Sequence, residues 1–164
     1  MEEILREGLR ELGVPASPEA LERLRGYGAR LLEKNAVTNL TAIRDEEGVA
    51  RLHFLDCAAL LTAADFAGAR VLDVGSGAGF PGIPLRILQP DVELTTVDSV
   101  GKKVDFVRET CDALGIDGVT CLWGRVEELP ALRESFDIAV SRAVAELDVL
   151  AELCLPQVRP GGLF

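Results

Sequence analysis

The chain contains the segment Val71-Leu72-Asp73-Val74-Gly75-Ser76-Gly77-Ala78-Gly79-Phe80-Pro81-Gly82, from which the rest of its architecture can be worked out. The segment opens with a short apolar run that is typical of a buried strand. Alternating glycines follow, and they permit positive φ and leave no Cβ between the backbone and a ligand. Pro81 suits the first turn of a helix, which Pro90 then stops. Strand, glycine turn and helix start together predict a nucleotide-binding loop.

Two details of this segment bear on which nucleotide it binds. Residues 77–82 fit G-x-G-x-x-G, the dinucleotide pattern, so a nicotinamide- or flavin-dependent oxidoreductase is one interpretation. However, Asp73 extends the pattern to D-x-G-x-G-x-G, which resembles motif I of S-adenosylmethionine-dependent methyltransferases. Pro81 and Pro84 also remove N–H donors that would grip a pyrophosphate. A ligand without phosphates, such as S-adenosylmethionine, loses less by their absence.

From Arg70 onward, strand patterns alternate with helix patterns. This alternation predicts an α/β fold with a doubly wound, mostly parallel sheet of the Rossmann-like type. We expect strands at 70–74, 93–97, 119–123 and 136–141, helices at about 81–88, 102–114 and 147–155, a turn at 160–162 and the start of a fifth strand at 163.

Before Arg70, apolar residues at helical spacing predict three helices, at 2–12, 18–34 and about 46–62. Ser17 is expected to cap the second helix. These helices carry no glycine-rich site of their own. We therefore expect residues 1–66 to form a helical cap and residues 67–164 to form the cofactor-binding core, within one globular unit.

Composition limits the class of protein. The 164 residues are 48% hydrophobic and 27% charged, as in a globular domain with its own core. No apolar run approaches the roughly 20 residues of a membrane span, and the acidic N-terminus is not a signal peptide. Only one histidine accompanies the widely spaced cysteines, which argues against a metal site and a disulfide framework and for a cytoplasmic location. These cysteines are Cys57, Cys111, Cys121 and Cys154.

Ligands of doubly wound sheets bind at the carboxyl ends of the strands, where several polar residues fall here. Asp98 could accept hydrogen bonds from a ribose diol, or could only cap the following helix. Val126 could lie along the edge of an adenine. Glu127 could accept a hydrogen bond from the exocyclic amine of that adenine, or could lie exposed on the surface. Arg142 is expected to point into the cleft, whereas Phe80 could pack either on the cofactor or in the core.

Further motifs accompany the glycine-rich segment from about residue 35 to the end. They are Asn39-Leu40-Thr41-Ala42-Ile43, His53-Phe54-Leu55-Asp56, Pro81-Gly82-Ile83-Pro84, Gly101-Lys102-Lys103, Gly124-Arg125-Val126-Glu127-Glu128 and Ser141-Arg142-Ala143. Together these motifs resemble the bacterial 16S ribosomal RNA guanine-N7 methyltransferases, the glucose-inhibited division protein B family. Pro81–Pro84 and Ser141–Ala143 are far more specific than the glycines alone.

The resemblance implies methyl transfer from S-adenosylmethionine to N7 of a guanine, with 16S rRNA or the 30S subunit as partner and a monomeric enzyme. Guanine N7 has a lone pair and no proton, so the attack needs no general base. The enzyme's task is to hold the nucleophile, methyl group and leaving sulfur in line. A chain with one histidine and no nucleophile–base pair suits that reaction. A non-catalytic RNA-binding or ribosome-assembly module is the remaining interpretation.

The resemblance and the motif together assign site residues. The cofactor residues are Asp73, Gly75, Gly77, Gly79, Phe80, Asp98, Ser99, Val126, Glu127 and Arg142, of which Arg142 is also the catalytic candidate. The candidate substrate residues are Asn39, Thr41, His53, Lys102 and Lys103, and we expect His53 to tie the cap to the core. Two features depart from the family. The net charge of −10 disfavours RNA binding, and the family continues beyond a fifth strand, so we expect a C-terminal truncation.

Overall fold

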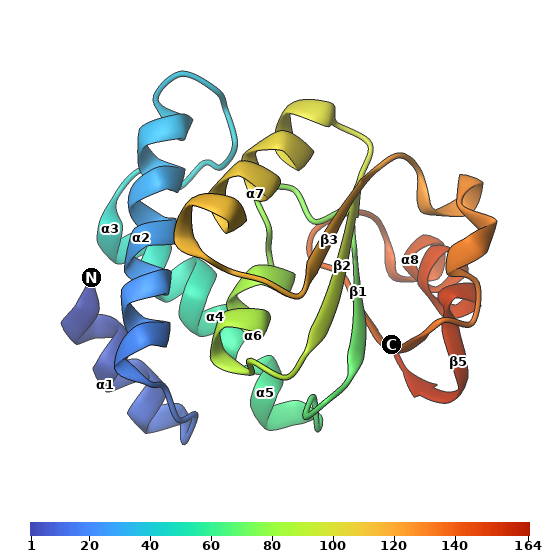
Figure 1. The fold of residues 1–164 in the computed structure, drawn as a ribbon, viewed down its shortest axis with the longest axis horizontal. Helices are drawn as coiled ribbons and strands as arrows, with labels where there is room; N and C mark the ends of the chain where they lie inside the picture. Colours follow the sequence, from blue (N-terminus) through green and yellow to red (C-terminus); the bar gives the residue numbers. More distant parts are fainter.

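The computed structural model describes residues 1–164 and contains one five-stranded parallel sheet in the order β3-β2-β1-β4-β5 (Figure 1). This arrangement confirms the predicted doubly wound α/β fold. The strands are β1 (Arg70–Val74), β2 (Glu93–Asp98), β3 (Val119–Trp123), β4 (Phe136–Val140) and β5 (Val158–Leu163).

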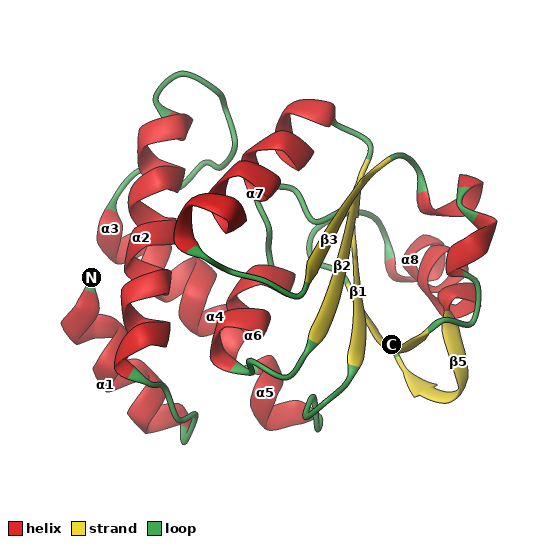
Figure 2. Ribbon diagram, in the orientation of Figure 1, coloured by secondary structure: helices red, strands yellow, loops and turns green.

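Helices cover both faces of the sheet, as Figure 2 shows. On one face lie α6 (Gly82–Leu88) and α7 (Gly101–Leu114), with the N-terminal helices outside them, and on the other lies α8 (Leu147–Cys154). Three short 3₁₀ turns complete the second face: η2 (Val126–Glu128), η3 (Pro130–Leu132) and η4 (Leu155–Gln157). None of the helices combines the length and the apolar character needed to cross a membrane.

Alternate residues of β1 supply two separate hydrophobic clusters, because successive side chains of a strand point to opposite faces. Val71 belongs to a cluster of 30 buried residues that also contains Ile83 of α6 and Leu24 of the cap. Leu72 belongs to a cluster of 8 on the other face, together with Cys154 of α8. The larger cluster joins the cap and the sheet in one continuous core. The boundary at residues 66 and 67 stays a prediction.

The first two helices of the cap follow the predicted pattern. They are α1 (Glu2–Leu12) and α2 (Pro18–Asn35), and the Ser17 hydroxyl accepts the Ala20 N–H at 3.0 Å as the expected N-cap.

The single helix expected at 46–62 is wrong in detail. The structure has four short pieces there: α3 (Glu46–Gly48), the π-helical η1 (Val49–Leu55), α4 (Asp56–Ala58) and α5 (Leu60–Ala63). The rings of His53 and Phe54, both on η1, pack against Phe80. Phe80 is far from His53 and Phe54 in the sequence, so this contact cannot be predicted from a 3.6-residue periodicity.

The turn expected at 160–162 is also wrong, because these residues lie inside β5. Phe136 pairs with Val158 and Ile138 pairs with Leu163, so β5 carries extra residues in a bulge against β4. Pro160 cannot donate to the ladder, and a bulge in an edge strand tolerates it.

Candidate functional site

A cleft of about 440 Å³ opens at the carboxyl edge of the sheet. The chain runs outward from β1 to β2 and β3 and then returns to β4 on the other side of β1, so the strand order reverses there. Such a switch point is where α/β sheets bind ligands, and the volume lies in the range of small-molecule sites. The sequence therefore predicted the position of the cleft correctly.

The glycine-rich loop after β1 forms the floor of this cleft. Gly75 and Gly77 have φ of +69° and +55°, a region that favours glycine. A Cβ on Gly75 would collide with Val144, whereas one on Gly77 would meet nothing within 4 Å. Gly79 does not line the cleft, and its α-carbon lies against the Tyr27 hydroxyl instead. Gly77 is thus the position where a ligand can approach the backbone on the side that a Cβ would occupy, whereas Val144 fills that side of Gly75.

Asp73 does not line the cleft, which corrects its expected place among the cofactor-binding residues. Its side chain is fully buried, and Oδ2 accepts the N–H of Gly82, the first residue of α6, at 2.8 Å. Oδ1 has no hydrogen-bond partner. Burial raises the pKa of Asp73 to about 8. The carboxyl group therefore supports the loop from behind.

Asp98 does line the cleft, with a side chain only 8% exposed. Oδ2 accepts the Gly77 N–H and Oδ1 accepts the Val100 N–H, both at 2.8 Å. The carboxylate thereby ties the glycine loop to the segment that begins α7. Each oxygen has a further lone pair, so holding the loop does not prevent Asp98 from accepting hydrogen bonds from a ligand.

The loop after β3 forms the wall of the cleft beyond Asp98. Val126 and Glu127 of this loop line the cleft as expected, and so does Ser99, which directly follows β2. Val126 is buried among the core residues of the second face, whereas Glu127 is exposed. The structure thus places an apolar surface and a carboxylate side by side.

The cationic residues near the cleft are partly those expected. Lys103 lines the cleft and Lys102 does not. Arg125, which the sequence analysis did not single out, lines it as well. Its position directly before Val126 is the signal that could have identified it. Asn39 lies outside the cleft, in a separate shallow hollow, where its Oδ1 accepts from Arg44 at 3.3 Å.

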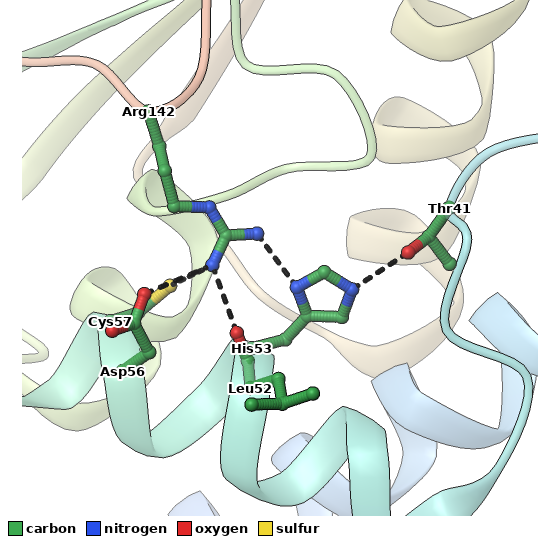
Figure 3. Close-up of polar contacts among 6 residues, drawn as sticks. All are labelled: Thr41, Leu52, His53, Asp56, Cys57 and Arg142. Atoms are coloured by element: carbon green, nitrogen blue, oxygen red, sulfur yellow. Dashed lines mark hydrogen bonds and ion pairs between the residues drawn. The ribbon is translucent and has the colours of Figure 1, made fainter.

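Arg142 follows β4 and meets the cap across the cleft (Figure 3). Nη1 donates to the Leu52 carbonyl and to Oδ2 of Asp56, both at 3.3 Å, and lies 3.8 Å from Sγ of Cys57. Nη2 lies 2.7 Å from Nδ1 of His53. The expectation that His53 ties the cap to the core is confirmed by this contact.

The His53 and Arg142 side chains share Phe80 as a neighbour. The imidazole stacks on the Phe80 ring with centroids 4.4 Å apart and planes 7° from parallel. The Arg142 Cζ lies 5.2 Å from the centroid of the same ring. Nε2 of His53 is 2.9 Å from Oγ1 of Thr41, so the structure brings four of the expected site residues together at one end of the cleft. Phe80 itself is 5% exposed and belongs to the core as well as to the cleft wall.

The electrostatic surroundings hold His53 neutral. Burial lowers its pKa to about 4, the Arg142 charge adds to this effect, and the Asp56 carboxylate opposes it. Burial also raises the pKa of the Cys57 thiol to about 12, so this sulfur is not a thiolate at neutral pH. The cleft can bind and orient a ligand. Thr41 and His53 both line it and are hydrogen-bonded to each other, but Nδ1 of His53 accepts from Arg142, so the neutral ring has its hydrogen on Nε2 and cannot act as a base toward the Thr41 hydroxyl. No three His, Cys, Asp or Glu side chains gather in a group that could hold a metal ion, and the expectation of a metal-free site stays a prediction.

The parallel sheet and its switch-point cleft define a Rossmann-like α/β protein. A crystal structure of a SAM-dependent methyltransferase from Aquifex aeolicus shares the fold, with a TM-score of 0.55 and 23% identity over 71% of this chain and 63% of that one. The family profile described as GidB, rRNA small subunit methyltransferase G, matches residues 20–164. The chain belongs to this family.

Two relatives carry the name ribosomal RNA small subunit methyltransferase G. The one from Moorella thermoacetica is 43% identical, over 94% of this chain and 66% of its own length. The one from Pelotomaculum thermopropionicum is 43% identical, over 99% of this chain and 70% of its own length. The chain thus spans about two thirds of the length of these relatives. Family membership favours the methyltransferase over the oxidoreductase interpretation.

Proposed function

We propose that this chain carries the S-adenosylmethionine site of an enzyme that methylates N7 of a guanine in 16S rRNA. The observation that carries the proposal is the cleft at the switch point, where an open glycine loop, a carboxylate and an arginine from three different strand ends face one space. The family membership of residues 20–164 and the names of the relatives support the same activity.

The residues in the cleft fit this cofactor. The backbone at Gly77 is open on the side where a Cβ would stand, so a ligand can lie directly against it. Asp98 keeps free lone pairs after accepting two backbone N–H groups, which suits a ribose diol. The buried Val126 beside Glu127 suits an adenine ring with its exocyclic amine.

S-adenosylmethionine supplies, when bound, a methyl group on a positively charged sulfur. Asp98 orients the ribose, and the glycine loop allows the methionine portion to approach the backbone. Arg142 can only donate hydrogen bonds, since a guanidinium does not lose its proton at working pH. It therefore binds and orients a carboxylate, a phosphate or a guanine edge and is no base. Positioning suffices for this reaction, because guanine N7 attacks with a lone pair and has no proton to remove.

Cofactor binding is tested by calorimetry and by the melting temperature with S-adenosylhomocysteine, with NADH as the competing ligand. We expect S-adenosylhomocysteine alone to bind, and Asp98→Ala to weaken its binding by about 1.5–3 kcal/mol, the range for hydrogen bonds to a charged group. Asp105→Ala is the matched control, because this exposed acid pairs with Arg108 outside the cleft. Binding of NADH instead would overturn the proposal.

The substrate is tested by methyl transfer to 30S subunits and to free 16S rRNA, followed by nucleoside analysis of the RNA. We expect 7-methylguanosine as the product, a monomeric enzyme and a site of action in the bacterial cytoplasm. A different methylated nucleoside would contradict the N7 assignment. Cofactor binding without turnover on either substrate would favour the non-catalytic ribosome-assembly module.

A further inference from the structure

The guanidinium of Arg142 is anchored by one short stretch of the cap. All four of its hydrogen-bonding partners lie between residues 52 and 57, on η1 and α4. A guanidinium has five N–H donors. The recorded contacts involve only Nη1 and Nη2, so the Nε–H and one hydrogen of Nη2 are left without a partner. Arg142 is therefore fixed on one side and keeps donors for a ligand.

The contact between Arg142 and His53 defines the tautomer of the imidazole. A guanidinium only donates, so Nδ1 of His53 must accept and carry no hydrogen. A neutral imidazole then has its single hydrogen on Nε2, which donates to Oγ1 of Thr41 at 2.9 Å. The two ring nitrogens thus have opposite and fixed roles.

We propose that His53 is a positioning residue, whose unprotonated Nδ1 fixes the planar Arg142 guanidinium beside Phe80 to bind an oxyanion in the cleft. This inference rests on the proposed function. The oxyanion is either the carboxylate of the cofactor or a phosphate of the RNA, since both match a guanidinium through two parallel hydrogen bonds. Lysine lacks this planar fork and would not replace Arg142.

The loop that follows α2 holds Thr41 in place to receive the hydrogen bond from His53. Asn35 is 4% exposed, and its Nδ2 donates to the Thr41 carbonyl at 2.9 Å. Its Oδ1 accepts the N–H groups of Leu40 and Thr41, at 2.8 and 2.9 Å. The Ile43 N–H donates to Oγ1 of Thr41 at 3.2 Å. The hydroxyl that receives the His53 hydrogen is therefore built into an ordered loop.

Phe80 couples this network to the cofactor loop. It directly follows Gly79, and both the imidazole and the guanidinium lie against its ring. The charged groups facing the imidazole are Arg142, from the segment after β4, and Asp56, on the adjoining α4. A proton on Nδ1 would remove the acceptor and place two positive charges in contact, so the neutral form is the one that positions Arg142.

Nuclear magnetic resonance of the nitrogen-15-labelled protein tests the geometry directly, because His53 is the single histidine of the chain. At pH 7 we expect the Nε2–H tautomer in the neutral state and a pKa well below that of a free histidine. Arg142→Gln should raise this pKa, because it removes the positive charge that helps to lower it. An Nδ1–H tautomer, or a protonated ring at pH 7, would overturn the proposal.

Two variants separate positioning from mere packing. His53→Asn keeps an acceptor close to the place of Nδ1, whereas His53→Leu keeps apolar volume beside Phe80 without any acceptor. We expect His53→Leu to weaken ligand binding on the order of ten- to a hundredfold and His53→Asn to stay within about threefold of the native protein. Equal losses in both variants, or no loss in His53→Leu, would overturn the role.

The affected ligand identifies the oxyanion. A loss in the affinity for S-adenosylhomocysteine assigns the cofactor carboxylate, and a raised KM for RNA at unchanged cofactor affinity assigns a phosphate. The melting temperature of each variant shows whether the fold is retained. If the native protein binds neither ligand, the proposed function fails. The tautomer of His53, and the shift of its pKa in Arg142→Gln, still decide whether His53 holds Arg142.

Discussion

Asp73 shows how a residue of the glycine-rich motif can act from behind the cleft that the motif lines. It lies in the buried part of β1, and its side chain is fully shielded from water. Oδ2 holds the first turn of α6 through the Gly82 N–H, while Oδ1 has no partner. Ionising such a group costs much of its hydration, so the folded protein favours the protonated carboxyl.

The pH dependence of stability follows from this raised pKa. The folded state keeps the Asp73 proton up to a pKa of about 8, whereas the unfolded chain releases it near 3.8. Between these values the folded state binds more protons, so the free energy of unfolding falls as the pH rises. Asp73→Asn has no ionisable carboxyl at this position, so its free energy of unfolding should not fall with pH in this way. The variant should be more stable than the native protein, by a margin that grows from pH 5 to pH 8 and is on the order of a few kcal/mol.

Urea denaturation at several pH values measures this margin. Asp137→Asn is the matched control, and its effect should have the opposite sign. Hydrogen bonds from the Arg70 N–H and from Arg159 lower the pKa of this half-buried carboxyl. This variant should be less stable than the native protein at neutral pH. A margin for Asp73→Asn that stays constant with pH would contradict the assignment.

At the scale of elements, α2 connects the cap to the cofactor loop through Tyr27. The fully buried hydroxyl donates to the carbonyl of Ala78, inside the glycine loop. The ring meets those of Phe54, Phe80 and Phe106 edge-on, at centroid distances of 6.5, 6.0 and 5.8 Å. One side chain of the cap thus contacts η1, the loop and α7 together.

Tyr27→Phe retains these ring contacts and removes one hydrogen bond. The carbonyl of Ala78 then loses its buried partner, which should destabilise the protein by about 1–3 kcal/mol. Tyr27→Leu removes aromatic volume as well and should cost more, about 3–5 kcal/mol. Because the core is continuous between cap and sheet, both variants should unfold in a single urea transition. Two separate transitions would show that the cap unfolds on its own.

The position of a residue relative to the strands decided which features the sequence could predict. The strands were found because each is a short apolar run between polar residues, and Asp98 and Arg142 were found because they stand where such runs end. Asp73 lies on an equally buried strand, yet its side chain turns toward α6. Lys102 and Asn39 similarly lie near the cleft but do not line it. Side-chain direction depends on packing between distant segments, which spacing along the chain does not encode.

At the scale of the whole molecule, the net charge of −10 opposes the approach of RNA. Against this background, the cleft gathers three cations, Lys103, Arg125 and Arg142. Lys103 and Arg125 make no ion pair, while Arg142 pairs with Asp56 at 3.3 Å. Long-range attraction therefore contributes little to RNA binding, and a few local contacts must carry it.

The salt dependence of RNA affinity measures how many phosphates these cations neutralise. Each phosphate contact with single-stranded RNA contributes about −0.7 to the slope of log affinity against log salt, so three cations give a slope no steeper than about −2. Fluorescence anisotropy of a labelled 16S rRNA fragment provides the measurement. Lys103→Gln should reduce the slope by about 0.7, whereas Arg10→Gln, on α1 outside the cleft, should leave it unchanged. A slope near −6 would show that the RNA is held by a surface other than this cleft, because the cleft does not contain enough cations to produce it.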